Sequence, residues 1–134
     1  MKTSFDMLDR LHPVIDTSTI NAVLDGEVWR RKKPVGRQIK EIEVNTLPIT
    51  DDRESDVQDG VMLVNIYAPN YNNGTPNETD LKAVLTLVVT AIENYTPSAG
   101  EFCNLKIISE NIMQDMDDVK MSYVGLRVNY HVEV

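Results

Sequence analysis

The chain has 134 residues, of which 42% are hydrophobic and 25% are charged. This length and composition are ordinary for one globular domain and argue against intrinsic disorder. The formal net charge of −8 disfavours general attraction to nucleic-acid phosphates, and we expect no sequence-specific nucleic-acid binding. No apolar run approaches the roughly 20 residues that span a bilayer, so we expect no membrane partner.

The N-terminal segment predicts an amphipathic helix. Apolar residues recur at helical spacing from Phe5 to Ile15, with Ser4 as the expected N-cap. Pro13 is expected to kink or end this helix. Charged residues within the first ten positions interrupt the apolar core that a secretion signal requires, so we expect no signal peptide there.

Alternating and β-branched residues predict a mostly antiparallel or mixed sheet of four to five strands. Segment 60–68 is apolar on nearly both faces, which predicts a central position in that sheet. The last strand alternates strictly from Val124 to Val134 and should form a hairpin with the strand before it. The polar segment 45–60 is interpreted as a loop. The expected strands are 27–31, 38–44, 60–68, 105–112 and 121–134.

A second, longer helix follows the central strand. Thr75, Pro76 and Glu78 fit the N-cap, the first and the third helical positions, and an apolar stripe begins at Leu81. We therefore expect an α+β fold in which the sheet packs against one long helix and an N-terminal helix. Residues 1–134 are expected to form one domain.

Residues that carry catalysis or bind metals are few and scattered. His12 and His131 are isolated, and we expect each to be solvated or locally hydrogen-bonded. Cys103 is the only cysteine and is expected to be a buried thiol. The sequence contains no phosphate loop, dinucleotide fingerprint, nucleophile elbow or zinc motif. We therefore predict no catalytic site, no cofactor and no metal site.

Charge is distributed unevenly along the sequence. A basic stretch, RRKKPVGR, precedes one acidic segment and lies far in sequence from another. Lysines on a solvated strand edge would explain the basic stretch, and an electrostatic contact with an acidic neighbour is the rival explanation. The candidate subunit-interface residues are Arg30, Arg31, Lys32, Lys33, Arg37, Asp51, Asp52, Glu54, Asp56, Asp115, Asp117 and Asp118.

Three segments carry a family resemblance: VWRRKKPVGRQIKEIEVNTLPI, an apolar strand that ends in VNIYAPN, and the closing strand GLRVNYHVEV. Together with the order of the helices, this pattern resembles the tail terminator and tail completion (minor tail) proteins of long-tailed bacteriophages and prophages. The resemblance covers nearly the whole chain in order of elements. Its motifs describe strands and turns, with no chemical signature.

The resemblance implies a non-enzymatic structural protein. Members of the family form a homo-oligomeric ring, usually a hexamer, that ends the polymerisation of the tail tube. The implied partners are the tail tube protein and the head-tail connector protein, and the implied location is the cytoplasm during assembly and then the virion tail. A head-to-tail ring needs two complementary patches. We hypothesise that the basic stretch and the acidic segments supply them.

Two other classes of function stay open at this point. A small-molecule or peptide-binding module would use the loop 69–75 and the strand faces beside it. A metal-dependent enzyme would use the carboxylates of Asp115, Asp117 and Asp118, although this segment lacks the glycine and the terminal glutamate of a calcium loop. A solvated hairpin turn is the simpler interpretation of the same three residues.

Overall fold

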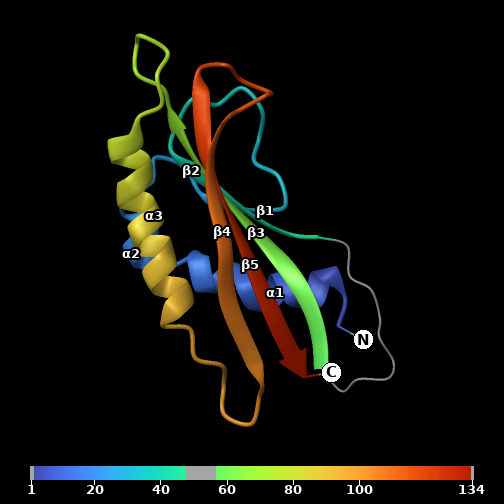
Figure 1. Ribbon diagram of the computed structural model, residues 1–134. Coiled ribbons are helices and arrows are strands. Elements are labelled where there is room, and N and C mark those ends of the chain that lie inside the picture. Colours follow the sequence, from blue (N-terminus) through green and yellow to red (C-terminus); the bar gives the residue numbers. More distant parts are fainter. Residues whose placement is uncertain (1, 48–56, 134) are drawn as a thin grey trace.

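The computed structural model describes residues 2–47 and 57–133 and shows a five-stranded mixed sheet with its helices on one face (Figure 1). The strands lie in the order β1-β2-β3-β5-β4; β1 pairs parallel to β2, and the other neighbours are antiparallel. This confirms the predicted α+β fold. The elements are α1 (Ser4–Ile15), α2 (Ser18–Asn21), β1 (Val28–Arg30), β2 (Glu41–Thr46), β3 (Val57–Pro69), α3 (Glu78–Glu93), β4 (Cys103–Gln114) and β5 (Met121–Glu133).

Helix α1 begins with a capping box, one residue earlier than predicted. Thr3, not Ser4, is the N-cap: its side chain accepts a hydrogen bond from the Asp6 backbone N–H at 3.2 Å, and the Asp6 carboxylate accepts from the Thr3 N–H at 2.7 Å. The backbone hydrogen bond from Thr3 lowers the pKa of Asp6. The helix continues through Pro13 and ends at Ile15.

Helix α3 begins two residues later than the sequence predicted. Asn77 is its N-cap and accepts a hydrogen bond from the Asp80 N–H at 3.1 Å. The predicted cap, Thr75, instead donates its hydroxyl hydrogen to the Asn73 side chain at 2.7 Å. An asparagine that reaches the third helical N–H satisfies the same donors as the predicted threonine, so the local signal was right in kind but wrong in position.

We expect Asn77→Ala to lower the free energy of unfolding by about 1 kcal/mol, because the Asp80 N–H at the start of α3 loses its side-chain acceptor. Thr75→Ala is the matched control, and its loss should stay below about 0.5 kcal/mol because it removes an exposed contact outside the helix. Chemical denaturation of both variants measures the difference. A larger loss in the Thr75 variant would restore the cap position predicted from the sequence.

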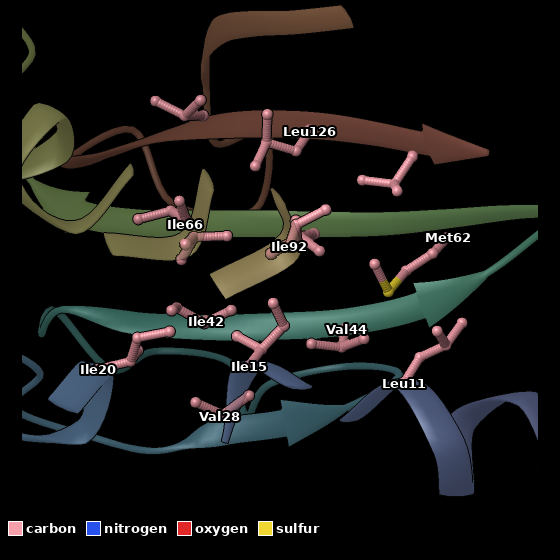
Figure 2. Close-up of a cluster of buried hydrophobic side chains, with 14 of the residues drawn as sticks. Leu11, Ile15, Ile20, Val28, Ile42, Val44, Met62, Ile66, Ile92 and Leu126 are labelled. Atoms are coloured by element: carbon pink, nitrogen blue, oxygen red, sulfur yellow. The ribbon is translucent and has the colours of Figure 1, made fainter. Parts of the chain in front are cut away.

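The hydrophobic core lies between one face of the sheet and the helices. Alternate residues of β2, β3 and β5 point to this face, because cross-strand partners such as Ile42 and Ile66 lie on the same side of a pleated sheet. Figure 2 shows Ile42 and Val44 close to Ile15 of α1, with Leu126 beyond β3. Each fully buried aliphatic side chain contributes about 1.5–3 kcal/mol through removal from water. The α3 stripe adds the buried residues Leu81, Val84, Val88 and Ile92.

Strand β3 is central, as predicted, but it is longer than the sequence indicated. Residues 57–60 pair with β5, and β2 continues to Thr46, so both ends of the predicted 45–60 loop are strand. The polar composition of these residues favours a loop, but their backbone groups pair with neighbouring strands. The predicted hairpin of β4 and β5 is confirmed, with a register shift between Ile107 and Ser109.

Candidate functional site

The face of the sheet opposite the helices is rich in polar side chains. Glu43 of β2 pairs with Asn65 of β3, and Glu41 pairs with Tyr67. These residues alternate with the core residues, so they project from the open face. Both glutamates are nonetheless buried, Glu41 at 0% exposure and Glu43 at 8%. Buried carboxylates need hydrogen-bond partners, so the polar contacts of these two glutamates constrain this region of the sheet.

Glu43 is the centre of a hydrogen-bond network. Its Oε1 accepts from the Tyr67 hydroxyl at 2.7 Å and from the Asn65 amide at 3.2 Å, and its Oε2 accepts from the Lys33 backbone N–H at 2.8 Å. The network therefore ties β2 and β3 to the loop between β1 and β2. The Tyr67 ring also packs against Tyr123 of β5, with ring centroids 5.0 Å apart.

Burial and the hydrogen bond to Glu43 raise the pKa of Tyr67 far above its usual value of 10.0, and burial raises the pKa of Tyr130 to about 12. A raised native pKa means that the native state holds these protons more tightly than the unfolded state. We therefore expect the stability that these two tyrosines contribute to be fully present below about pH 10 and to fall as pH rises further. Urea unfolding between pH 8 and 11 measures this fall. Tyr67→Phe should reduce the dependence of the free energy of unfolding on pH in this range. An unchanged dependence would show that Tyr67 is not the group responsible.

Arg31 turns the basic loop toward this network. Its φ of 71° lies in the left-handed region, which non-glycine residues rarely adopt. The guanidinium donates to the Ser4 hydroxyl at 2.9 Å and to the Asn45 amide oxygen at 3.4 Å, and lies 5.0 Å from the centre of the Phe5 ring. These contacts hold the strained backbone, and strained positions of this kind are concentrated at functional sites.

The basic loop and the acidic β4–β5 turn, which the sequence places far apart, meet within one subunit. Lys33 Nζ lies 3.8 Å from the Asp115 carboxylate, and Lys32 Nζ lies 3.9 Å from the Asp117 carboxylate. Lys33 and Asp115 are buried, whereas Lys32 and Asp117 are exposed. Between the loop and the turn lies an open pocket of about 220 Å³, lined on its inner wall by Glu43 and Tyr67.

The other candidate interface residues have different surroundings. Arg30 pairs with Asp9 of α1 at 2.8 Å. Arg37 lies 3.3 Å from the buried Glu41 carboxylate, with its guanidinium 5.6 Å from the Trp29 ring centre. Asp118 lines the same pocket as Asp117. The remaining four, Asp51, Asp52, Glu54 and Asp56, lie outside the described residues.

A second, larger pocket of about 440 Å³ adjoins the β4–β5 turn on its other side. Tyr71 and Gly74 of the loop before α3 line it together with Val119 and Lys120. Its volume is within the range of small-molecule sites. The loop 69–75 that the sequence indicated as a binding segment therefore does border a cavity.

The two histidines are locally hydrogen-bonded, as the sequence predicted. His12 Nε2 donates to the Val28 carbonyl at 2.7 Å, and His131 contacts the Asp59 carboxylate. Cys103 is buried. Within residues 2–47 and 57–133, no group of three or more histidine, cysteine, aspartate or glutamate side chains is arranged to hold a metal ion.

No described helix has both the length and the apolar composition needed to cross a membrane.

Comparison with known proteins gives a match in structure only. No protein-family model and no curated protein sequence matches the chain. A solved structure described as the virion of a native gene transfer agent (GTA) particle contains a chain of similar fold, with a TM-score of 0.58. The two chains are 15% identical, and the similarity covers 88% of this chain and 87% of the other.

Sequence reasoning missed Glu43, Tyr67 and Glu41 as the buried polar centre. The segment EIEVN does show the signal, since its glutamates alternate with apolar residues and so face away from the core. Alternation alone predicts a solvated face. These glutamates are buried by the basic loop and by Tyr67. The residue pattern of a single strand contains no information about such neighbours.

Proposed function

We propose that this chain is a structural subunit of a phage or prophage tail that forms a ring, completes or terminates the tail tube, and contacts the head-tail connector. The observation that carries the proposal is the shared fold with a chain of a gene transfer agent virion, which extends over most of both chains. The order of elements and the closing strand, which resemble tail terminator proteins, support the finer role. A non-enzymatic function accords with the described side chains, whose polar clusters are tied into the fold.

Deleting the gene in a particle-producing host tests this role directly. A protein that ends tube growth should, when absent, leave tubes of irregular length without attached heads. Electron microscopy of the particles, with the gene restored in trans as control, measures both features. Tails of normal length joined to heads in the deletion strain would refute the terminator role.

The ring itself is tested with exposed charges. Arg30 and Arg31 hold contacts inside the subunit, so reversing them would also disturb the fold. Lys32 is 68% exposed and suits the test better. We expect Lys32→Glu to reduce ring formation severalfold in light scattering without changing the melting temperature. The matched control is Lys82→Glu on the exposed face of α3, which should assemble normally. Equal assembly of both variants would exclude Lys32 from the interface.

A second candidate function is a small-molecule or peptide-binding module. The pocket of about 440 Å³ beside Tyr71 favours it. Tyr71→Ala should then weaken binding of a ligand found by thermal-shift screening. A screen of small molecules and short peptides that yields no stabilising compound would leave the assembly role as the sole candidate.

A further inference from the structure

The two edges of the sheet differ in how well they are protected from pairing with another chain. Strand β1, at one edge, has three residues, and the left-handed Arg31 follows directly after its last residue. Strand β4, at the other edge, has twelve residues, contains no proline and pairs with β5 alone among the described residues. A long edge strand without such protection is a template for a further strand. The register shift between Ile107 and Ser109 interrupts β4, so the regular part of its free edge is 103–107.

Alternate residues of this stretch direct their backbone hydrogen-bonding groups out of the sheet. The Glu133 N–H donates to the Phe102 carbonyl at 3.2 Å, so the backbone of Phe102 faces β5. Hydrogen-bonded and non-hydrogen-bonded pairs alternate along an antiparallel ladder. The N–H and C=O groups of Leu105 and Ile107 therefore point away from β5, where they are available to a further strand.

The side chains of Leu105 and Ile107 lie beside a groove between β4 and the end of α3. Both residues pair with buried residues of β5, so they face the helices, and both are only half-buried. Figure 1 shows α3 alongside β4. The groove has a volume of about 320 Å³ and is lined by Ile92, Glu93, Leu105, Lys106 and Ile107. Because residues opposite each other in a sheet lie on the same face, a strand paired with Leu105 and Ile107 places its own alternate side chains in this groove.

The edge and the groove together define the chemistry of the occupant. The free backbone groups of β4 require an extended segment with N–H and C=O groups at matching spacing. The groove is apolar at three of its five lining residues, and its two charged residues, Glu93 and Lys106, have opposite signs. It therefore favours neither an anion nor a cation. Aliphatic side chains at every second position of the occupant satisfy both the edge and the groove.

A second copy of this chain fits the edge poorly. Its available edges are β1, whose three residues match only part of the stretch, and its own β4. Two antiparallel copies of β4 can bring Leu105 of one opposite Ile107 of the other. In that register the two Lys106 side chains lie directly opposite each other, and like charges in this position destabilise a strand pair. The occupant is therefore better supplied by a different protein.

We propose that β4 accepts an extended segment of a different protein as a sixth strand, with aliphatic side chains at alternate positions of the segment filling the groove beside α3. The backbone of the segment bonds to Leu105 and Ile107, and its side chains cover Ile92. This strand addition goes beyond the proposed tail role, since its chemistry does not depend on membership of a virion.

The test uses the full ¹⁵N-labelled chain and the peptide acetyl-Lys-Val-Thr-Val-Thr-Val-Lys-amide, whose valines alternate. In NMR titrations we expect the peptide to shift the amides of residues 92–93 and 103–108. The isomer acetyl-Lys-Val-Val-Val-Thr-Thr-Lys-amide has the same composition and charge without the alternation. It should bind about fivefold more weakly, because one of its groove-facing positions carries threonine in place of valine.

N-methylated peptides separate strand addition from other modes of binding. In the proposed pairing, each valine that faces the groove also points its N–H toward β4, whereas the threonine N–H groups point away. Methylating the nitrogen of the central valine should weaken binding about tenfold, because one hydrogen bond is lost. Methylating a threonine nitrogen is the matched control, and its affinity should stay within about twofold of the parent peptide.

A pair of protein variants locates the bound peptide. Ile107→Lys places a charge in the groove and should abolish binding. Ser109→Lys, on the exposed part of β4, is the control and should retain it. The peptide comparisons use the wild-type chain, so they decide the question even if Ile107→Lys does not fold.

The proposal would be overturned by an absence of shifts, by shifts confined to other surfaces, or by equal affinity for the alternating peptide and its isomer. Equal losses from the two N-methylations, or full binding by a folded Ile107→Lys variant, would also refute it. Shifts at residues 103–108 that depend on protein concentration without peptide would assign this edge to a second copy and overturn the choice of a different protein.

Discussion

Replacing Gly60 with alanine should lower the free energy of unfolding by about 2–3 kcal/mol. Gly60 pairs with Tyr130 across the two central strands, and a Cβ at this position would lie 2.2 Å from the Tyr130 Cζ and hydroxyl oxygen. Tyr130 is fully buried, so its ring has no free space into which to move. Urea unfolding of the purified variant measures the loss.

Gly125→Ala is the matched control for this substitution. The nearest atom to its added Cβ would be the terminal Cε of Met113 at 3.3 Å, the end of a flexible side chain. We expect a loss below about 1 kcal/mol there. Combining Gly60→Ala with Tyr130→Phe should recover part of the stability. The Tyr130 hydroxyl is buried and has no hydrogen-bond partner within the described residues, so its removal also relieves an unmet polar group. Equal losses for the two glycine variants would contradict the steric explanation.

Glu43→Ala should have a similarly large effect, about 3 kcal/mol. The substitution removes the acceptor of the Tyr67 hydroxyl, the Asn65 amide and the Lys33 N–H, and it leaves these donors in a largely buried region. The Lys33 loop should also loosen, because its backbone contact to β2 is lost. Hydrogen exchange at the Lys33 amide, followed together with urea unfolding, separates the local effect from the global one.

A double-mutant cycle identifies the contribution of one partner. Tyr67→Phe alone leaves Glu43 with two donors, and its effect should be smaller than that of Glu43→Ala in the same urea assay. In the double variant, the two losses should not add, because both remove the same hydrogen bond. Glu110→Ala on the exposed part of β4 serves as control and should stay within about 0.5 kcal/mol of the wild type. Additive losses would show that the Tyr67 contact does not stabilise the fold.

Most of the fold follows from periodicity in the sequence. The alternation from Val124 to Val134 reports one buried face, and the structure buries Val124, Leu126, Val128, Tyr130 and Val132 as that pattern requires. The predictions failed where two signals competed. Thr75-Pro76 is a strong helix start by composition, yet Asn77 is the cap; at residues 57–60, long-range pairing with β5 overrode polar composition.

The candidate site was less accessible to sequence reasoning. The basic stretch and the acidic turn both stand out in the sequence, where they predict complementary patches that meet between two subunits. The structure instead brings Lys33 to Asp115 within one chain. Their meeting depends on strand order, because β5 lies next to β3 and thereby carries the turn at its start toward the loop that precedes β2. Charge runs in a sequence carry no information on that order.

The pairing of β3 with β5 also bears on the kinetics of folding. Strand β5 forms a local hairpin with β4, but its register with β3 is fixed only after the intervening chain, including all of α3, has been enclosed. Closing so long a segment carries an entropic penalty that the local hairpin avoids. The hairpin and α3 should therefore form early, and docking of β3 onto β5 should limit the rate. Substitutions at the β4–β5 turn would then slow refolding and leave the rate of unfolding nearly unchanged, whereas substitutions in β3–β5 contacts that form only after docking would mainly raise the rate of unfolding.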